Sequence, residues 1–252
     1  GVLRICKICD VPAVIAVRRD ATLAGSLINA LIAAGQEDDF IDPKGALPII
    51  SQRTLCIVVD TYQLGLVESR EILEKCGKVA VIDHHRKGVG FIEKADLVCH
   101  EPYASSASEL VTEFLQYVGD RDDKPNRIEA EGLLSGIMLD TRDFTLHTGV
   151  RTFEAAAALR RYGAETEHVR QLFDVSMVEY TTKARLVSEA QMYRGCAITV
   201  SGEVAPEARV AIAQAANDLL TIQNVEASFV AVQVGTGCLL YTSPSPRDKR
   251  QS

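Results

Sequence analysis

Residues 79–88 read Val-Ala-Val-Ile-Asp-His-His-Arg-Lys-Gly, and they join an apolar run directly to a group of ionisable side chains. The four apolar residues Val79–Ile82 predict a short buried strand. Asp83, His84 and His85 follow without a spacer, and each can bind a metal ion or carry a proton. The sequence therefore predicts a functional site at the carboxyl end of this strand.

A second apolar run, Leu55–Val59, ends in the same way at Asp60. The residues between the two runs predict a helix at 67–76 that stops at a glycine. Strands that alternate with helices predict an α/β fold with a doubly wound, mostly parallel sheet. Ligands bind outside the carboxyl ends of the strands in such sheets, so Asp60 and Asp83 are expected at one binding edge.

Further elements of this domain are predicted from apolar periodicity and from glycine boundaries. They are a strand at 11–17, helices at 21–34, 106–118, 128–139 and 152–162, and two helices between 163 and 193. Ser106–Glu109 fits a capping box at the start of one helix, and Asp140 follows the apolar helix 128–139.

After Gly195 the pattern predicts a second, smaller α/β domain, with a strand at 196–201, a helix at 205–220 and a strand at 225–234. The last residues contain Ser, Pro and basic side chains without periodicity, and they resemble translated sequencing-adapter read-through. We therefore expect three parts: a first domain over 1–194, an incomplete second domain over 195–236, and a foreign, disordered tail over 237–252. A second domain of this kind would expose a strand edge.

The chain has 252 residues, 47% of them hydrophobic, and a formal net charge of −7. A pI near 5.3 argues against binding duplex nucleic acid, which favours a basic surface, but not against a small phosphate ligand held by metal ions. No apolar run approaches the ~20 residues that cross a bilayer, and scattered cysteines suggest reduced thiols in the cytosol. We therefore expect this segment itself to be soluble.

Asp60, Asp83, Asp140 and the His84–His85 pair form the main concentration of metal-binding residue types in the chain. Carboxylates combined with imidazole suit Mn²⁺ or a similar divalent ion, and a two-metal site activates water at a phosphoryl centre. Each residue also has a structural explanation, as a turn cap, a helix end or a surface loop. Their joint position at the ends of apolar elements favours the metal site.

Four segments resemble the DHH/DHHA1 phosphoesterase superfamily: Val58–Thr61, Val81–Gly88, Glu101–Glu113 and Ser135–Ala156. Within it, the chain is similar to the membrane-anchored cyclic-di-AMP phosphodiesterases of Gram-positive bacteria. The resemblance implies two Mn²⁺ ions and hydrolysis of the cyclic dinucleotide cyclic-di-AMP to linear pApA. It also places the parent protein at the cytoplasmic face of the cell membrane, anchored by segments outside these residues, and it is compatible with a homodimer.

The resemblance implies a role for each residue of the cluster. Asp60 would bridge the metals, His84 would bind the second metal, and Asp140 would complete the ligands of that metal. Asp83 would hold the histidine pair in place. His85 would face the scissile phosphate and stabilise the charge of its transition state.

Three other residues are candidates for binding the substrate. Ser105 and Ser106 stand at a predicted helix N-terminus, where they could seat a phosphate or simply cap the helix. Arg151 could contact phosphate or pair with a surface acid. For all three residues, both readings stay open.

The chain also departs from the superfamily pattern. The H-x-x-x-D-x-D motif would precede Gly1, the tail stands in place of a glycine-rich G-G-G-H segment, and His147 occupies a position where arginine is expected. We therefore expect this polypeptide to be an inactive fragment of an active enzyme. The alternatives are a soluble oligoribonuclease or phosphoadenosine phosphatase, a manganese pyrophosphatase, and a nucleotide-binding module without catalysis.

Overall fold

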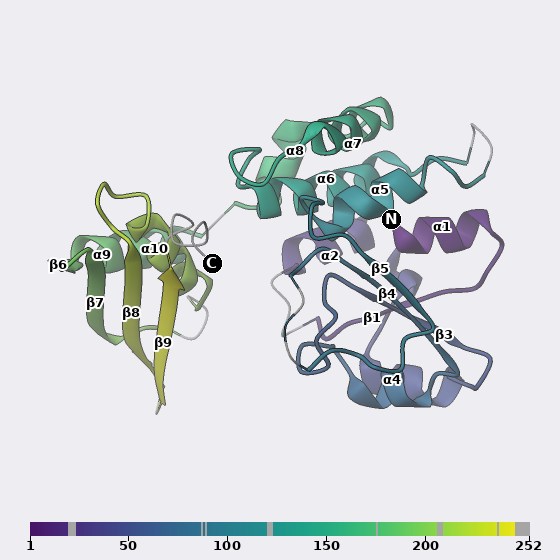
Figure 1. Ribbon diagram of the computed structural model, residues 1–252, viewed down its shortest axis with the longest axis horizontal. Helices are drawn as coiled ribbons and strands as arrows, with labels where there is room; N and C mark the ends of the chain where they lie inside the picture. Colours follow the sequence, from purple (N-terminus) through teal and green to yellow (C-terminus); the bar gives the residue numbers. More distant parts are fainter. Residues whose placement is uncertain are drawn as a thin grey trace. The chain divides into compact units, whose positions relative to one another are not determined.

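The computed structural model describes residues 1–19, 24–86, 88, 90–119, 123–174, 176–205, 209–235 and 237–244. The chain forms two compact units, Gly1–Phe173 and Asp174–Ser252, each considered by itself (Figure 1). The boundary therefore lies before the expected one at 194/195. The physical reason is that helix α9 (Met177–Ser188) buries Leu186 in the hydrophobic cluster of the second unit.

The first unit alternates strands and helices, as predicted. Its first part contains α1 (Val2–Ile8), β1 (Ile15–Ala16), α2 (Gly25–Ala33), η1 (Glu37–Asp39), β2 (Phe40–Ile41), α3 (Pro43–Ala46) and η2 (Leu47–Ile49). The main sheet and its helices follow: β3 (Leu55–Val59), α4 (Arg70–Lys75), β4 (Lys78–Asp83), β5 (Leu97–His100), α5 (Ala107–Phe114), α6 (Arg127–Thr141), α7 (Val150–Arg161) and α8 (Thr166–Gln171). Among the described residues, no helix has the length and apolarity needed to span a bilayer.

Strands β3, β4 and β5 form a parallel sheet in that order, and β1 pairs with β2 in a separate parallel pair. This confirms the predicted α/β class with parallel strands. The strand expected at 11–17 is only two residues long, because Val11 and Val14 are exposed and lie outside the sheet. Part of the helix expected at 21–34 falls on residues 21–23, which lie outside the described residues.

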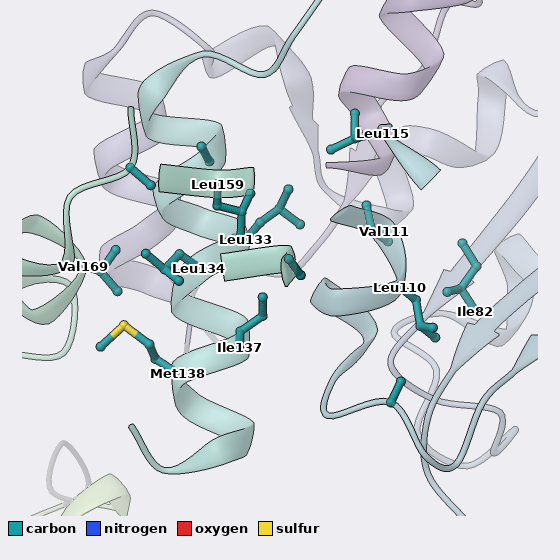
Figure 2. Close-up of a cluster of buried hydrophobic side chains, with 14 residues drawn as sticks. Ile82, Leu110, Val111, Leu115, Leu133, Leu134, Ile137, Met138, Leu159 and Val169 are labelled. Carbon is teal, nitrogen blue, oxygen red and sulfur yellow. The ribbon is translucent and has the colours of Figure 1, made fainter. Parts of the chain in front are cut away.

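Strand β4 is buried on both faces and lies between β3 and β5. Val79 and Val81 pack against a cluster that includes Leu73 of α4, whereas Ile82 packs against the cluster formed by α5, α6 and α7. Figure 2 shows the cluster that contains Ile82, with this residue beside the side chains of α5. A slip of one residue would exchange the two faces, so this packing fixes the register of β4 and the position of Asp83 at its end.

The described residues of the second unit form a mixed sheet and the helices α9 and α10. Its elements after α9 are β6 (Gln191–Tyr193), β7 (Cys196–Glu203), α10 (Arg209–Leu219), β8 (Ala227–Val234) and β9 (Gly237–Pro244). The strand order is β6-β7-β8-β9; β7 and β8 are parallel, and the two outer pairs are antiparallel.

The expectation of disorder from residue 237 onward is wrong for residues 237–244. These residues form β9, which pairs antiparallel with β8 from Val234↔Gly237 to Ala227↔Pro244. The cause is the β-prone composition of Cys-Leu-Leu-Tyr-Thr, together with Leu239, which packs against the core of this unit. The edge of β8 is therefore covered. Residues 245–252 lie outside the described residues, and a foreign origin of the tail stays a prediction.

Candidate metal centre

Asp60 follows β3 directly, and the adjacent strand holds its backbone. Its N–H donates to the carbonyl of Ile82 at 2.9 Å. Its φ is +64°, in the left-handed region that Asp tolerates better than most residues. Its side chain is 56% exposed. An exposed carboxylate on a constrained backbone at a strand end is a feature that functional sites commonly retain.

Asp83, the last residue of β4, is fully buried and holds the two histidines that follow it. Its Oδ1 accepts hydrogen bonds from the N–H of His84 at 2.8 Å, from the N–H of His85 at 3.2 Å and from Nδ1 of His85 at 2.7 Å. The Nδ1 bond leaves Nε2 of His85 for other partners, and this side chain is 56% exposed. The contacts show that Asp83 orients His85. A part of Asp83 and His85 in catalysis stays a prediction.

His84 lies between two carboxylates. Its Nε2 is 3.5 Å from Oδ1 of Asp60 and 3.5 Å from Oδ2 of Asp140. Its other ring nitrogen, Nδ1, is 3.3 Å from the carbonyl of Ala104, to which an Nδ1–H would donate. That bond favours the tautomer with a lone pair on Nε2, which is the form that binds metal ions.

The surroundings of Asp140 disfavour its ionised form. Burial raises the pKa of Asp140 to about 6, and the charge of Asp60 adds to the effect. Asp140 also lies in the last turn of α6, where the helix dipole disfavours a carboxylate. Burial lowers the pKa of His84, but the close approach of Asp60 and the charge of Asp140 outweigh it and leave this pKa raised. A bound cation would stabilise both carboxylates.

The residues fit a divalent metal ion. Two buried side-chain atoms among the described residues have no hydrogen-bond partner, and both belong to this cluster: Oδ2 of Asp83 and Nε2 of His84. Such atoms are rare in folded proteins and require an explanation. Two ligands at about 2.1 Å from one ion lie about 3.0 Å apart at a right angle and about 4.2 Å apart when opposite. The two separations of 3.5 Å fall between these limits.

His85 is a further candidate ligand. One ligand atom from each of Asp60, His84 and His85 lies within 4.8 Å of the others, and Asp140 joins this group through His84. From the sequence, His85 was assigned to the substrate and not to the metal. Since Asp83 occupies Nδ1, both roles of His85 would use the same Nε2 atom.

Ser105 and Ser106 are buried, and Ser106 is the N-cap of α5. The hydroxyl of Ser106 accepts from the N–H of Glu109 at 3.0 Å. The carboxylate of Glu109 in turn accepts from the hydroxyl of Ser105 at 2.6 Å and from its N–H at 3.2 Å. These contacts correspond to the capping interpretation for Ser106 and to a contact with Glu109 for Ser105, and a contact of either serine with phosphate stays a prediction.

Arg151, near the start of α7, pairs with acids of α5. Its Nε and Nη2 donate to the two carboxylate oxygens of Glu113 at 2.7 Å and 2.6 Å, and these bonds raise the pKa of Arg151. The guanidinium is also 4.0 Å from Glu101 and 4.0 Å from the buried Glu109. Arg151 lines a hollow of about 530 Å³ with residues of α5 and α7. The structure shows the ion pair, and a contact of Arg151 with phosphate stays a prediction.

Two residues beside the cluster were not identified from the sequence. Tyr62 contacts the segment after His85 through its hydroxyl, and His100, the last residue of β5, contacts the carbonyl of His85. Recognition of β5 as a strand would have placed His100 at the same sheet edge as Asp83, with which it is paired. No pattern in the sequence links Tyr62 to this segment.

The chain is thus an α/β protein with a candidate metal site, formed by Asp and His side chains at the carboxyl edge of a parallel sheet. Residues 15–137 match the DHH family, N-terminal domain, and this span includes Asp60, Asp83, His84 and His85. Residues 15–137 thus belong to the DHH family. DHH phosphoesterases are metal-dependent enzymes, in agreement with the Asp and His cluster.

Three similar proteins share the name cyclic-di-AMP phosphodiesterase. The chain is 46% identical over 198 residues to GdpP of Geobacillus thermodenitrificans, 42% over 193 residues to PdeA of Listeria monocytogenes, and 40% over 222 residues to GdpP of Bacillus subtilis. The alignments cover 78%, 76% and 85% of this chain, but only 30%, 29% and 34% of the relatives. The chain thus spans about a third of the length of the curated relatives that it matches.

The fold also matches a solved structure. An exopolyphosphatase-related protein from Bacteroides fragilis superimposes with a TM-score of 0.73, covering 97% of this chain and 84% of that protein. The two sequences are 16% identical, so the likeness supports the fold class alone.

Proposed function

We propose that the chain is part of a Mn²⁺-dependent phosphodiesterase that hydrolyses cyclic-di-AMP to linear pApA. The observation that carries the proposal is the buried Nε2 of His84, which has no hydrogen bond and faces Asp60 and Asp140 at 3.5 Å each. The names of the relatives supply the substrate, because each of the three is called a cyclic-di-AMP phosphodiesterase.

Asp60, His84 and Asp140 would hold the ion, with Ala104 fixing the imidazole through Nδ1. A mixed carboxylate and imidazole set suits Mn²⁺ better than it suits soft metals. The ion would supply an activated water and a positive charge beside the phosphate. These three residues suffice for one ion, and a second ion would need ligands in addition to them.

His85 would act on the phosphate through Nε2. Asp83 holds Nδ1 and so fixes the ring plane, while the exposed side of the ring is available to substrate. When His85 carries both protons, its Nε2–H can donate to an oxygen of the phosphodiester and stabilise the charge that develops there. Asp83 thus serves to orient this donor.

The test is hydrolysis of cyclic-di-AMP with and without Mn²⁺, by this chain and by a longer form of the protein that includes an H-x-x-x-D-x-D motif. We expect the longer form to release pApA and this chain to be much less active. We expect His84→Ala to abolish hydrolysis. His168→Ala is the matched control, since His168 pairs with Glu131 at 3.0 Å and takes no part in the cluster.

Other outcomes would redirect the proposal. Cleavage of pApA or short RNA but not of cyclic-di-AMP would favour the oligoribonuclease and phosphatase alternative and leave the metal site standing. Binding of cyclic-di-AMP by the longer form without hydrolysis would favour a nucleotide-binding module. The membrane anchoring of the parent and a homodimer belong to this proposal as well, and fractionation and light scattering of the longer form test them.

A further inference from the structure

The segment that follows Asp83 is held in place by groups outside the metal cluster. We call its described residues, His84–Arg86 and Gly88, the histidine loop. The chain returns from this loop to pair with the segment after Asp60: Gln63 forms a bridge with Phe91, and the N–H of Ile92 donates to the carbonyl of Tyr62 at 2.9 Å. The loop is therefore closed at its base by the residues that follow a proposed metal ligand.

Tyr62 fixes the backbone of the loop through its hydroxyl. The side chain is 5% exposed, and its O–H donates to the carbonyl of Arg86 at 2.5 Å. The same oxygen accepts from the N–H of Gly88. A Cβ at Gly88 would lie 3.2 Å from this oxygen, so glycine permits the close approach. One hydroxyl thus satisfies a donor and an acceptor of the loop that would otherwise need water or other partners.

His100 fixes the loop from the other neighbouring strand. It is the last residue of β5 and is paired with Asp83. Its Nε2 is 2.5 Å from the carbonyl of His85, and because a carbonyl only accepts, this nitrogen carries the proton in the contact. The rings of His100 and Tyr62 meet edge to face, with centroids 5.8 Å apart. The two side chains therefore contact each other as well as the backbone of the loop.

We propose that Tyr62 and His100 are positioning residues that aim the imidazole of His85 at the reacting phosphate. Asp83 sets the ring through Nδ1, but a ring can be aimed only if the backbone that carries it is also fixed. His100 fixes the carbonyl of His85, and Tyr62 fixes the carbonyl of Arg86 and the N–H of Gly88. Phenylalanine would fill the same volume as Tyr62, so the hydroxyl serves the loop and not the core. This inference rests on the proposed function of His85.

The test uses variants that remove one polar atom and keep the ring. Tyr62→Phe removes the hydroxyl, and His100→Phe removes the donor while keeping an aromatic edge. Tyr117→Phe and His168→Phe are the matched controls, since Tyr117 is 88% exposed and His168 pairs elsewhere. The kinetic measurements use the Mn²⁺-loaded longer form of the protein. Amide hydrogen exchange is measured in that form and in this chain.

We expect Tyr62→Phe and His100→Phe to lower kcat for cyclic-di-AMP by about tenfold or more, because misplacement of a catalytic group by about 1 Å is costly. The KM and the affinity for Mn²⁺ should stay within about twofold of the parent values, since substrate and metal contacts remain. The amide of Gly88 should exchange its hydrogen at least about tenfold faster in Tyr62→Phe, because its acceptor is gone.

Gly88→Ala gives an independent check. Its Cβ would press on the hydroxyl of Tyr62, so we expect a loss of kcat similar to that of Tyr62→Phe. The double variant Tyr62→Phe/Gly88→Ala should be no worse than either single variant, because the two changes break the same contact. Additive losses would contradict a shared role.

The result that would overturn the inference is a kcat within about twofold of the parent in both Tyr62→Phe and His100→Phe, or an unchanged exchange rate at Gly88. Equal losses of Mn²⁺ affinity and kcat would also overturn it, because they would indicate a role in metal binding. Failure of the proposed function is distinguishable: the parent would then leave cyclic-di-AMP intact, while the exchange at Gly88 still decides whether Tyr62 fixes the loop.

Discussion

Two polar clusters of the first unit, both singled out from the sequence, differ in how well their atoms are bonded. In the cluster of Ser105, Ser106, Glu109 and Arg151, each buried oxygen has a partner within the protein. In the cluster of Asp60, Asp83, His84 and Asp140, two buried atoms have none. The first is complete without a ligand, and the second is not.

The difference teaches how to separate structure from function among residues of similar type. Folding selects strongly for satisfied buried polar atoms, so a saturated cluster is explained by stability alone. An unsatisfied cluster opposes stability: Asp140 lies at a helix C-terminus, and its pKa is raised to about 6. We expect such a cluster where a bound ligand supplies the missing contacts.

The largest expected effect comes from breaking the unsatisfied cluster. His84→Ala removes the nitrogen that both acids face, so the affinity for Mn²⁺ should fall by at least about a hundredfold, or about 2.8 kcal/mol. Isothermal titration with Mn²⁺ measures this loss in the 252-residue chain itself. His168→Ala should bind Mn²⁺ like the parent. Retained affinity in His84→Ala would show that the ion, if bound, uses other residues.

The second prediction breaks the saturated cluster. Glu109→Ala leaves the N–H and hydroxyl of Ser105 buried without an acceptor, which should destabilise the fold by about 2 kcal/mol. Chemical denaturation monitored by circular dichroism gives the free energy of unfolding. Glu113→Ala, which removes a more exposed partner of Arg151, should cost less than about 1 kcal/mol.

The affinity for Mn²⁺ is the control in this experiment. Both glutamate variants should bind the ion as the parent does, because neither residue contacts Asp60, His84 or Asp140. A tenfold loss of affinity in Glu109→Ala would couple the two clusters, and the contrast between them would fail.

The sequence was sufficient for those parts of the fold where a strand is a continuous run of at least four apolar residues. The apolar run at 79–82 and that at 55–59 became β4 and β3 because both are strands of a parallel sheet. It was insufficient for β5, where the apolar run Leu97–Cys99 is too short to predict a strand. It also failed for β9, because the low-complexity end of the segment concealed a strand-forming start that pairs with β8.

For the site, the sequence could place acids at the ends of elements but could not report their partners. Asp60 and Asp83 are expected at the same edge because both follow strands of a parallel sheet, and His84 is expected there because it follows Asp83 in the chain. The capping of α5 by Ser106 follows from the local Ser106–Glu109 pattern, whereas the ion pair of Arg151 with Glu113 depends on helix packing, which no local pattern contains. For the same reason the contacts of Tyr62 with the histidine loop were not predicted.

The third prediction uses pH to sharpen the comparison. Burial and the charge of Asp60 raise the pKa of Asp140 to about 6, so Mn²⁺ must displace a proton below that pH. The pKa of His84 is raised above its ordinary value, so His84 takes up a proton first as the pH falls. The affinity should fall by about tenfold per pH unit, or about 1.4 kcal/mol per unit, once His84 is protonated, and more steeply below about pH 6, where Asp140 is protonated as well. Titrations from pH 5 to pH 8 measure the slope, and Asp140→Asn should bind more weakly with a shallower slope.

The same pKa has the opposite consequence for the metal-free protein. The folded state binds a proton at Asp140 more tightly than the unfolded state does, whose carboxyl has an ordinary pKa of 3.8. The contribution of this group to stability is therefore present below pH 3.8 and is lost as the pH rises through about 6. Saturating Mn²⁺ should reverse this dependence on pH. If Asp140 made the metal-free protein more stable as the pH rises, the raised pKa would be contradicted.

The smallest expected effect is that of Ser106→Ala. The hydroxyl of Ser106 caps α5 by accepting from the N–H of Glu109, and loss of such a cap costs about 1 kcal/mol. Ser106→Asp should restore most of this stability, because aspartate is also a good N-cap. If Ser106 only caps, the two variants will differ in stability but bind Mn²⁺ and substrate alike. If it seats a phosphate, the added carboxylate of Ser106→Asp will repel the substrate and raise KM while stability is restored, and Ser106 would then move from the structural cluster to the functional one.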